Sequence, residues 1–137
     1  MLARRPNVAR LATGIFLTAL IFIVLAANAG LARHYFGWFL ALPGGDLIGH
    51  FGLMGAFSFL VNYWLRCRRV RVGRLAPLQG TLIVAVVVSL EEFSQMFVLA
   101  RSFSLLDLGA DLMGIVIFGR LAEVACSREA AGDAANP

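Results

Sequence analysis

Four long apolar stretches, separated by short arginine-rich tracts, constrain the fold of this chain more than any other feature of its sequence. The stretches run from Leu11 to Ala29, Leu47 to Leu65, Gly80 to Ala100 and Leu105 to Val124. A helix needs roughly 20 mainly apolar residues to cross the hydrocarbon core of a bilayer. With 60% hydrophobic and 15% charged residues, the chain is too apolar for a soluble domain. The sequence therefore predicts an all-α membrane protein, a bundle of four transmembrane helices.

The distribution of arginine predicts how these helices are oriented. The connections after the first and third stretches hold only Arg33 and Arg101. Because basic residues are enriched on the cytoplasmic side, both termini and the middle connection are expected in the cytoplasm. Short basic tracts between apolar runs also argue against a nucleic-acid partner. The remaining basic residues are Arg4, Arg5, Arg10, Arg66, Arg68, Arg69, Arg71, Arg74, Arg120 and Arg128.

The C-terminal tail and the N-terminal apolar stretch are considered separately from the central helices. We expect residues 1–126 to form one transmembrane domain and residues 127–137 a disordered cytoplasmic tail, because the tail is small, polar and Ala-rich without periodicity. An alternative for the N-terminus is a cleaved signal peptide ending at Ala27-Asn28-Ala29. Its apolar part is longer than the roughly 7–15 residues usual in signal peptides, which favours a retained helix.

The two cysteines, Cys67 and Cys126, both fall at predicted cytoplasmic ends of helices. They lack the spacing of a metal site, and two are too few for a disulfide framework. Because the cytoplasm is reducing, we expect both to be reduced and structural.

The first outward connection, Gly30 to Gly45, is aromatic instead of polar. Aromatic side chains collect at the level of the lipid headgroups, so we expect this segment to lie on or dip into the outer interface. It is interpreted as an aromatic belt, with a lid over a site as the alternative. Its aromatic residues include Tyr35, Phe36, Trp38 and Phe39.

Acidic and other polar residues gather toward the outward ends of the predicted helices. A charge at the centre of a span costs roughly 2.5–3.5 kcal/mol, so such residues usually face the bundle interior and mark function. Glu91, Glu92 and Gln95 lie within one narrow arc of the third helix. Polar pairs four residues apart open the second and fourth helices. The expected ligand pocket consists of Asp46, His50, Glu91, Glu92, Gln95, Arg101, Asp107 and Asp111.

For some of these residues, a structural role is an alternative to a role in a ligand pocket. Asp46 follows a glycine turn and is typical of a helix N-cap. The run Ser104-Leu105-Leu106-Asp107 resembles a capping box. Arg101 is either an interfacial anchor or the counter-ion of the carboxylates. The residues hardest to explain structurally, because they lie deeper than the first turn or inside an apolar run, are His50, Glu92 and Asp111.

Five carboxylates share this layer with few cations. Not all can remain ionised and dry, so some must be protonated, reach water or neutralise a bound cation. Imidazole together with carboxylates is compatible with zinc or manganese. No cofactor is predicted, but the candidate metal ligands are Asp46, His50, Glu92 and Asp111.

The pattern of these polar residues resembles the VanZ-like family. The resemblance covers roughly Asp46 to Gly119 and is most specific from Glu91 to Asp107. Where the family commonly has Asn, this chain has Asp111. The resemblance implies a multi-pass protein of the bacterial cytoplasmic membrane and cell envelope, and the family's namesake is associated with teicoplanin resistance. The matching positions are Asp46-x-x-x-His50, Glu92-x-x-Gln95, Arg101, Asp107 and Gly114.

Three classes of function fit this pattern. The first is a non-catalytic envelope protein that binds a lipid headgroup, peptide or glycopeptide, linked through its family resemblance to antibiotic resistance. The second is an enzyme in which Glu92 or Asp107 is the general base and His50 an acid or metal ligand, acting on a lipid-linked or phosphoryl substrate. No known catalytic signature supports it. A proton or ion pathway is least favoured, because the cytoplasmic halves of the helices look almost purely apolar.

Overall fold

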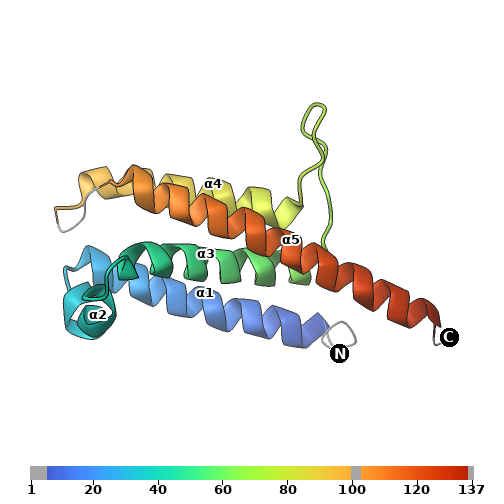
Figure 1. Ribbon diagram of the computed structural model, residues 1–137, viewed down its shortest axis with the longest axis horizontal. Coiled ribbons are helices and arrows are strands. Elements are labelled where there is room, and N and C mark those ends of the chain that lie inside the picture. The colour runs from blue at the N-terminus through green and yellow to red at the C-terminus, as the bar shows by residue number, and fades with distance from the viewer. Residues whose placement is uncertain (1–5, 100–102, 136–137) are drawn as a thin grey trace.

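The computed structural model describes residues 6–99 and 103–135, and most of these residues lie in helices (Figure 1). The all-α class predicted from the sequence is confirmed. The four longest helices overlap the four apolar stretches, but α4 ends at Ser94, six residues before the predicted end of the third stretch, and α5 continues to Ala135, beyond Val124. The elements are α1 (Pro6–Asn28), α2 (Ala32–Leu40), α3 (Gly45–Trp64), α4 (Gln79–Ser94), the short 3₁₀ helix η1 (Gln95–Phe97) and α5 (Leu105–Ala135).

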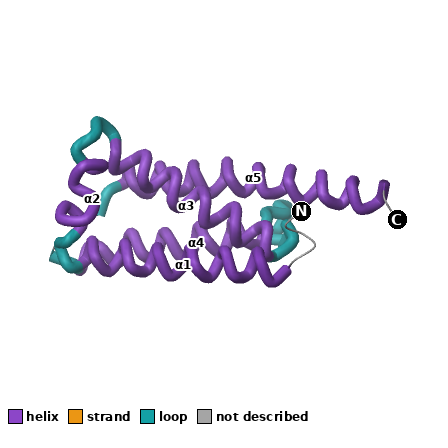
Figure 2. Tube along the Cα trace, turned by 90° about the horizontal axis from the view of Figure 1, so that it is seen from below, coloured by secondary structure: helices purple, strands orange, loops and turns teal. Residues whose placement is uncertain are grey.

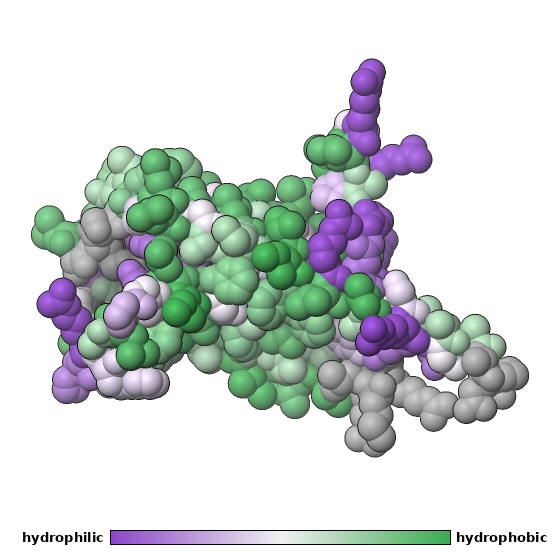
Figure 3. All heavy atoms as spheres, in the orientation of Figure 1, coloured by the Kyte–Doolittle hydropathy of each residue, from purple (hydrophilic) through white to green (hydrophobic). Residues whose placement is uncertain are grey.

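Among the residues that the structure describes, two segments are long and apolar enough to cross a membrane, Asn7–Asn28 and Gln79–Phe97. A third crossing is added if α2 and α3, which meet at a bend of 105°, are taken as one broken segment. Figure 3 shows hydrophobic surface around the middle of the bundle, with hydrophilic side chains gathered toward its ends. Length and composition therefore define a membrane protein with two or three candidate crossings.

The most extensively packed helix pair is α3 with α5, which run side by side in the ribbon and the tube view (Figures 1 and 2). Gly114 of α5 lies directly against the backbone carbonyl of Phe51. Gly55 of α3 faces the ring of Phe118 at a distance that leaves little room for any side chain. Glycines at a helix interface allow backbones to approach closely. The small residues noted in the sequence therefore set the spacing of this pair.

A buried polar network ties α3 to its neighbours in the half of the bundle away from the acidic residues. Ser58 Oγ donates to the carbonyl of Ile115, 2.9 Å away. Asn62 Nδ2 donates to Thr81 Oγ1 at 2.9 Å, and Asn62 Oδ1 accepts from the backbone N–H of Thr81 at 3.1 Å. The expectation that this half is almost purely apolar is therefore wrong in one respect. Ser58 and Asn62 are fully buried there, because their hydrogen bonds are satisfied within the protein.

The middle connection, residues 66–78, forms a short hairpin that projects sideways from the bundle (Figure 1). Isolated bridges join Arg69 to Leu78 and Val72 to Leu75. Gly73 begins the two-residue turn with a φ of 61°, and a positive φ at this position is what the favoured hairpin turns require. The basic loop predicted from the sequence therefore has a defined backbone path.

A disulfide joins Cys67 at the base of this hairpin to Cys126 of α5, with their Cα atoms 6.5 Å apart. The expectation of two reduced cysteines is therefore wrong for this structure. Arg66 and Cys67 both have positive φ, and this left-handed pair turns the chain sharply at the end of α3. The turn brings Cys67 against α5, a proximity that a sequence separation of 59 residues conceals.

The C-terminal segment is also more ordered than expected. Helix α5 continues through Ser127 and ends at Ala135, so the prediction of a disordered tail from residue 127 is wrong for the part that the structure describes. Alanine has the highest helix propensity, and the segment is rich in it. The hydroxyl of Tyr63 also donates to Glu129 and holds the extended helix to α3.

Candidate functional site

The predicted polar layer lies at the end of the bundle opposite the hairpin. There α3 and α5 begin and α4 ends, and α2 lies beside them. Figure 2 shows the same division from below, with α2 at one end and the chain termini toward the other. Seven of the eight predicted pocket residues fall within the described segments. Arg101 lies outside them.

His50 of α3 lies between carboxylates from two helices. Its Nδ1 atom is 3.1 and 3.2 Å from the two carboxylate oxygens of Asp111 on α5. When the Asp111 carboxylate is ionised it only accepts hydrogen bonds, and Nδ1 is then the donor. On the other side of the ring, Nε2 lies 3.8 Å from Oδ1 of Asp46. The Asp111 side chain is 2% exposed, that of His50 18% and that of Asp46 65%, so the imidazole connects the buried interior to the surface.

Glu92 of α4 is completely buried, and both of its carboxylate oxygens are hydrogen-bonded. Oε1 accepts from the backbone N–H of Ser104 at 3.0 Å, and Oε2 accepts from Nε2 of Gln95 at 2.7 Å. The same amide nitrogen donates to Oε2 of Glu91 at 3.0 Å. Gln95 therefore bridges the two adjacent carboxylates, as their shared helix face predicts.

The cap at the start of α5 differs from a simple capping box. Ser104 Oγ accepts from the backbone N–H of Asp107 at 3.2 Å, as the sequence predicts. In a capping box the acid three residues on would bond the backbone N–H of the capping residue. Here that N–H donates to Glu92 of the neighbouring helix. Glu92 therefore takes the capping position that Asp107 would fill.

The capping interpretation of Asp46 is wrong. The N-cap residue of α3 is Gly44, which has a positive φ, and no side chain caps the helix there. Asp46 lies inside the first turn, where a negative charge is still favourable beside the positive end of the helix dipole. Its carboxylate is left to face His50.

Five residues of the layer form two overlapping sets of potential metal ligands. His50, Glu92 and Asp111 each offer one donor atom, all within 4.8 Å of one another, and Asp46, His50 and Asp107 do the same. The structure thus divides the predicted four-ligand set between a buried group and a more exposed one that share His50. One imidazole with two carboxylates is a donor set suited to zinc or manganese.

The acidic layer also contains an unsatisfied atom. Within the described segments, Oε1 of Glu91 is buried and has no hydrogen-bond partner. Such an atom is costly unless water, an ion or another donor reaches it.

Close by in the sequence, the rings of Phe93 and Phe103 stack with their centroids 5.3 Å apart, joining the end of α4 to the segment before α5.

The aromatic connection packs next to the cluster as helix α2. A side chain at Gly49 would touch the ring of Phe39, so α2 contacts α3 one residue before His50. Tyr35 and Trp38 of the same helix are 48% and 75% exposed. This arrangement is compatible with the expected interfacial position. The lid over a site remains a prediction.

No protein-family model, no curated protein and no solved structure matches this chain. The class of this protein is therefore defined by its own sequence and structure. It is an all-helical membrane protein with a carboxylate and histidine cluster at one end of the bundle.

Proposed function

We propose that the chain is a VanZ-like protein of the bacterial cytoplasmic membrane, with four crossings and both termini in the cytoplasm. Helices α1, α3, α4 and α5 overlap the four apolar stretches, and α1 begins and α5 ends toward the hairpin end of the bundle (Figure 1). Ten of the twelve arginines belong to the termini, the hairpin and α5, which favours the cytoplasm for that end. The disulfide at the same end is unusual for a reducing compartment, but the arginine bias outweighs one cross-link.

In this orientation the acidic cluster faces outward and binds a positively charged group of an envelope ligand. The ligand is a lipid headgroup, a peptide or a glycopeptide, the last in line with the resistance associated with the family. One observation carries the proposal: a single imidazole, His50, lies among carboxylates from α3, α4 and α5. Carboxylates only accept hydrogen bonds, and an ammonium group only donates them.

The exposed and the buried residues of the cluster have different roles in this proposal. Asp46 and Asp107 are the accessible carboxylates that a ligand meets first. Glu92 and Asp111 are buried, and they hold the start of α5 and the His50 ring in place. This role is a binding role and requires no reaction.

Neutralising the accessible carboxylates should weaken ligand binding. We expect Asp107→Asn to lower the affinity of detergent-purified protein for teicoplanin or phosphatidylethanolamine about tenfold, because a hydrogen bond to a charged group contributes about 1.5–3 kcal/mol. Titration calorimetry measures the change. Asp133→Asn removes the same charge from an exposed position near the other end of α5 and should leave the affinity unchanged. An equal loss in both variants, or no binding of either probe to the native protein, would reject the proposal.

The donor atoms within 4.8 Å of one another favour a second candidate, a metal-assisted enzyme acting on a lipid-linked or phosphoryl substrate. In this case His50, Glu92 and Asp111 hold a divalent cation, and Asp107 is the accessible base. The purified protein should then contain about one zinc or manganese ion per chain by elemental analysis, and His50→Ala should lose it, since one of three protein ligands is gone. Absence of stoichiometric metal after incubation with either ion would exclude this candidate.

A further inference from the structure

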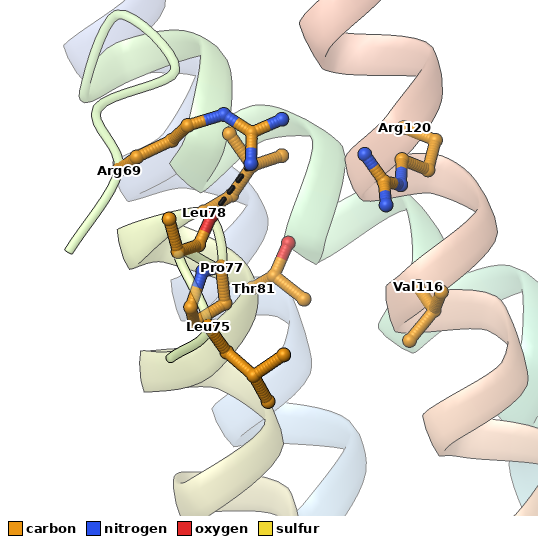
Figure 4. Close-up of a pocket in the computed structure, with 8 residues that line it drawn as sticks. Arg69, Leu75, Pro77, Leu78, Thr81, Val116 and Arg120 are labelled. Atoms are coloured by element: carbon orange, nitrogen blue, oxygen red, sulfur yellow. Dashed lines mark hydrogen bonds between the residues drawn. The ribbon is translucent and has the colours of Figure 1, made fainter. Parts of the chain in front are cut away.

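We propose that a cavity at the arginine-rich end of the bundle binds the phosphate of an anionic phospholipid headgroup. The cavity has a volume of about 320 Å³ and lies between the hairpin, the start of α4 and α5. Figure 4 shows Arg69 and Arg120 extending toward each other from opposite sides, with the hydroxyl of Thr81 between them. The rest of the lining is apolar and consists of Leu75, Ala76, Pro77, Leu78 and Val116.

The two guanidinium groups are held in position by hydrogen bonds that occupy only some of their N–H donors. Arg69 donates to the carbonyl of Ala76 at 2.6 Å and pairs with Glu123. Arg120 donates to the other carboxylate oxygen of Glu123 at 3.1 Å. One carboxylate between two guanidinium groups leaves a net positive charge. A guanidinium group has five N–H donors in a planar fork that matches phosphate oxygens.

Both arginines remain accessible from outside the protein. Their side chains are 44% and 69% exposed for Arg69 and Arg120, against 27% for Glu123. A ligand can therefore reach the guanidinium groups without displacing the carboxylate that positions them. Thr81 Oγ1 accepts a hydrogen bond from Asn62, which leaves its own hydroxyl proton free to turn toward the cavity.

The apolar lining favours a lipid over free phosphate. A phospholipid headgroup places a charged phosphate directly above a glycerol and acyl region, and this cavity likewise combines arginines with aliphatic side chains. The hairpin leaves the bundle sideways and carries hydrophilic side chains outward (Figures 1 and 3). A basic segment lying along an anionic leaflet gains about 1 kcal/mol per arginine. This inference is independent of the ligand of the acidic cluster.

Retention of lipid by the purified protein tests the proposal. The detergent-solubilised native chain is mixed with short-chain phosphatidylglycerol, short-chain phosphatidylcholine or inorganic phosphate, and bound molecules are counted by native mass spectrometry. We expect one phosphatidylglycerol per chain, retained in preference to phosphatidylcholine and not displaced by millimolar phosphate. Arg120→Gln should weaken this retention about tenfold. Glu123 still has Arg69 as a partner in this variant.

Two further variants separate the cavity from general attraction to a basic surface. Arg74→Gln removes the same charge at the hairpin turn, outside the cavity, and should retain lipid as the native chain does. Val116→Phe fills the apolar lining without changing charge, at a half-exposed position where a larger side chain has room, and should weaken retention as Arg120→Gln does. The proposal is overturned if Arg74→Gln loses as much lipid as Arg120→Gln, or if either cavity variant binds like the native chain. Displacement by phosphate alone would also overturn it and assign the site to the free ion.

Discussion

Replacing Gly114 with leucine is expected to destabilise the bundle by about 3 kcal/mol, the upper part of the range for overpacked interiors. A Cβ atom at this position would overlap the backbone carbonyl of Phe51. Backbone cannot rotate out of the way as a side chain can, so α3 and α5 must separate. Unfolding in detergent, followed by circular dichroism against added denaturant, measures the loss.

Gly109 provides a matched control on the same helix. It is exposed, and a side chain there would meet no atom within 4 Å. Gly109→Leu should therefore be neutral or stabilising, because leucine favours a helix more than glycine does by up to about 1 kcal/mol. Comparable destabilisation by both substitutions would show that close packing at Gly114 is not what holds the pair together.

The same close contact positions the acidic cluster. Phe51 follows His50 directly in α3, and Gly114 lies about one turn after Asp111 in α5. The approach of the backbones at Gly114 is what brings the imidazole within 3.1 Å of the Asp111 carboxylate. Gly114→Leu should consequently disrupt the site as well as the fold. Under the proposed VanZ-like assignment, Gly114 would belong to the family pattern because of packing that the polar residues require.

Hydropathy and helical periodicity predict the parts of this structure that depend on one helix at a time. The four apolar stretches become the four longest helices. The shared arc of Glu91, Glu92 and Gln95 becomes a hydrogen-bonded group. The convergence of polar residues from three helices also follows, because α3 and α5 begin where α4 ends, at the same end of the bundle.

Contacts that depend on the path between helices are not visible in the sequence. The cap of α5 by Glu92 requires the α4–α5 connection to bring Ser104 back against α4. Likewise, Cys67 reaches Cys126 only through the left-handed turn after α3. Asn62 inside an apolar stretch was the available signal for the second polar network, since a buried amide needs partners. The helical tail lacks the apolar periodicity that marks packed helices, and the helix propensity of its alanines was the signal that favoured a helix.

Replacing Glu92 with leucine is also expected to destabilise the protein strongly, because two donors form hydrogen bonds to its carboxylate. In Glu92→Leu, the backbone N–H of Ser104 loses its acceptor in a part-buried position, and the buried amide of Gln95 keeps only its hydrogen bond to Glu91. The unsatisfied N–H of Ser104 costs about 1–3 kcal/mol, and the lost hydrogen bond from Gln95 to a carboxylate adds to it, so we expect this variant to lose about 3 kcal/mol of stability. Denaturant unfolding in detergent measures it, as for Gly114.

Glu92→Gln separates the structural role of this residue from a chemical one. The glutamine carbonyl can still accept from Ser104, and rotation of the Gln95 amide lets its oxygen accept from the new side chain at the expense of its hydrogen bond to Glu91, so we expect a loss of about 1–2 kcal/mol, smaller than in Glu92→Leu. Because Glu92 is buried beneath the accessible carboxylates, affinity for the ligand should stay within about threefold of native. An enzyme that used Glu92 as its base would instead lose about 10²–10⁴-fold in turnover. A stably folded Glu92→Gln protein that no longer binds its ligand would contradict the positioning role and place Glu92 in direct contact with the ligand.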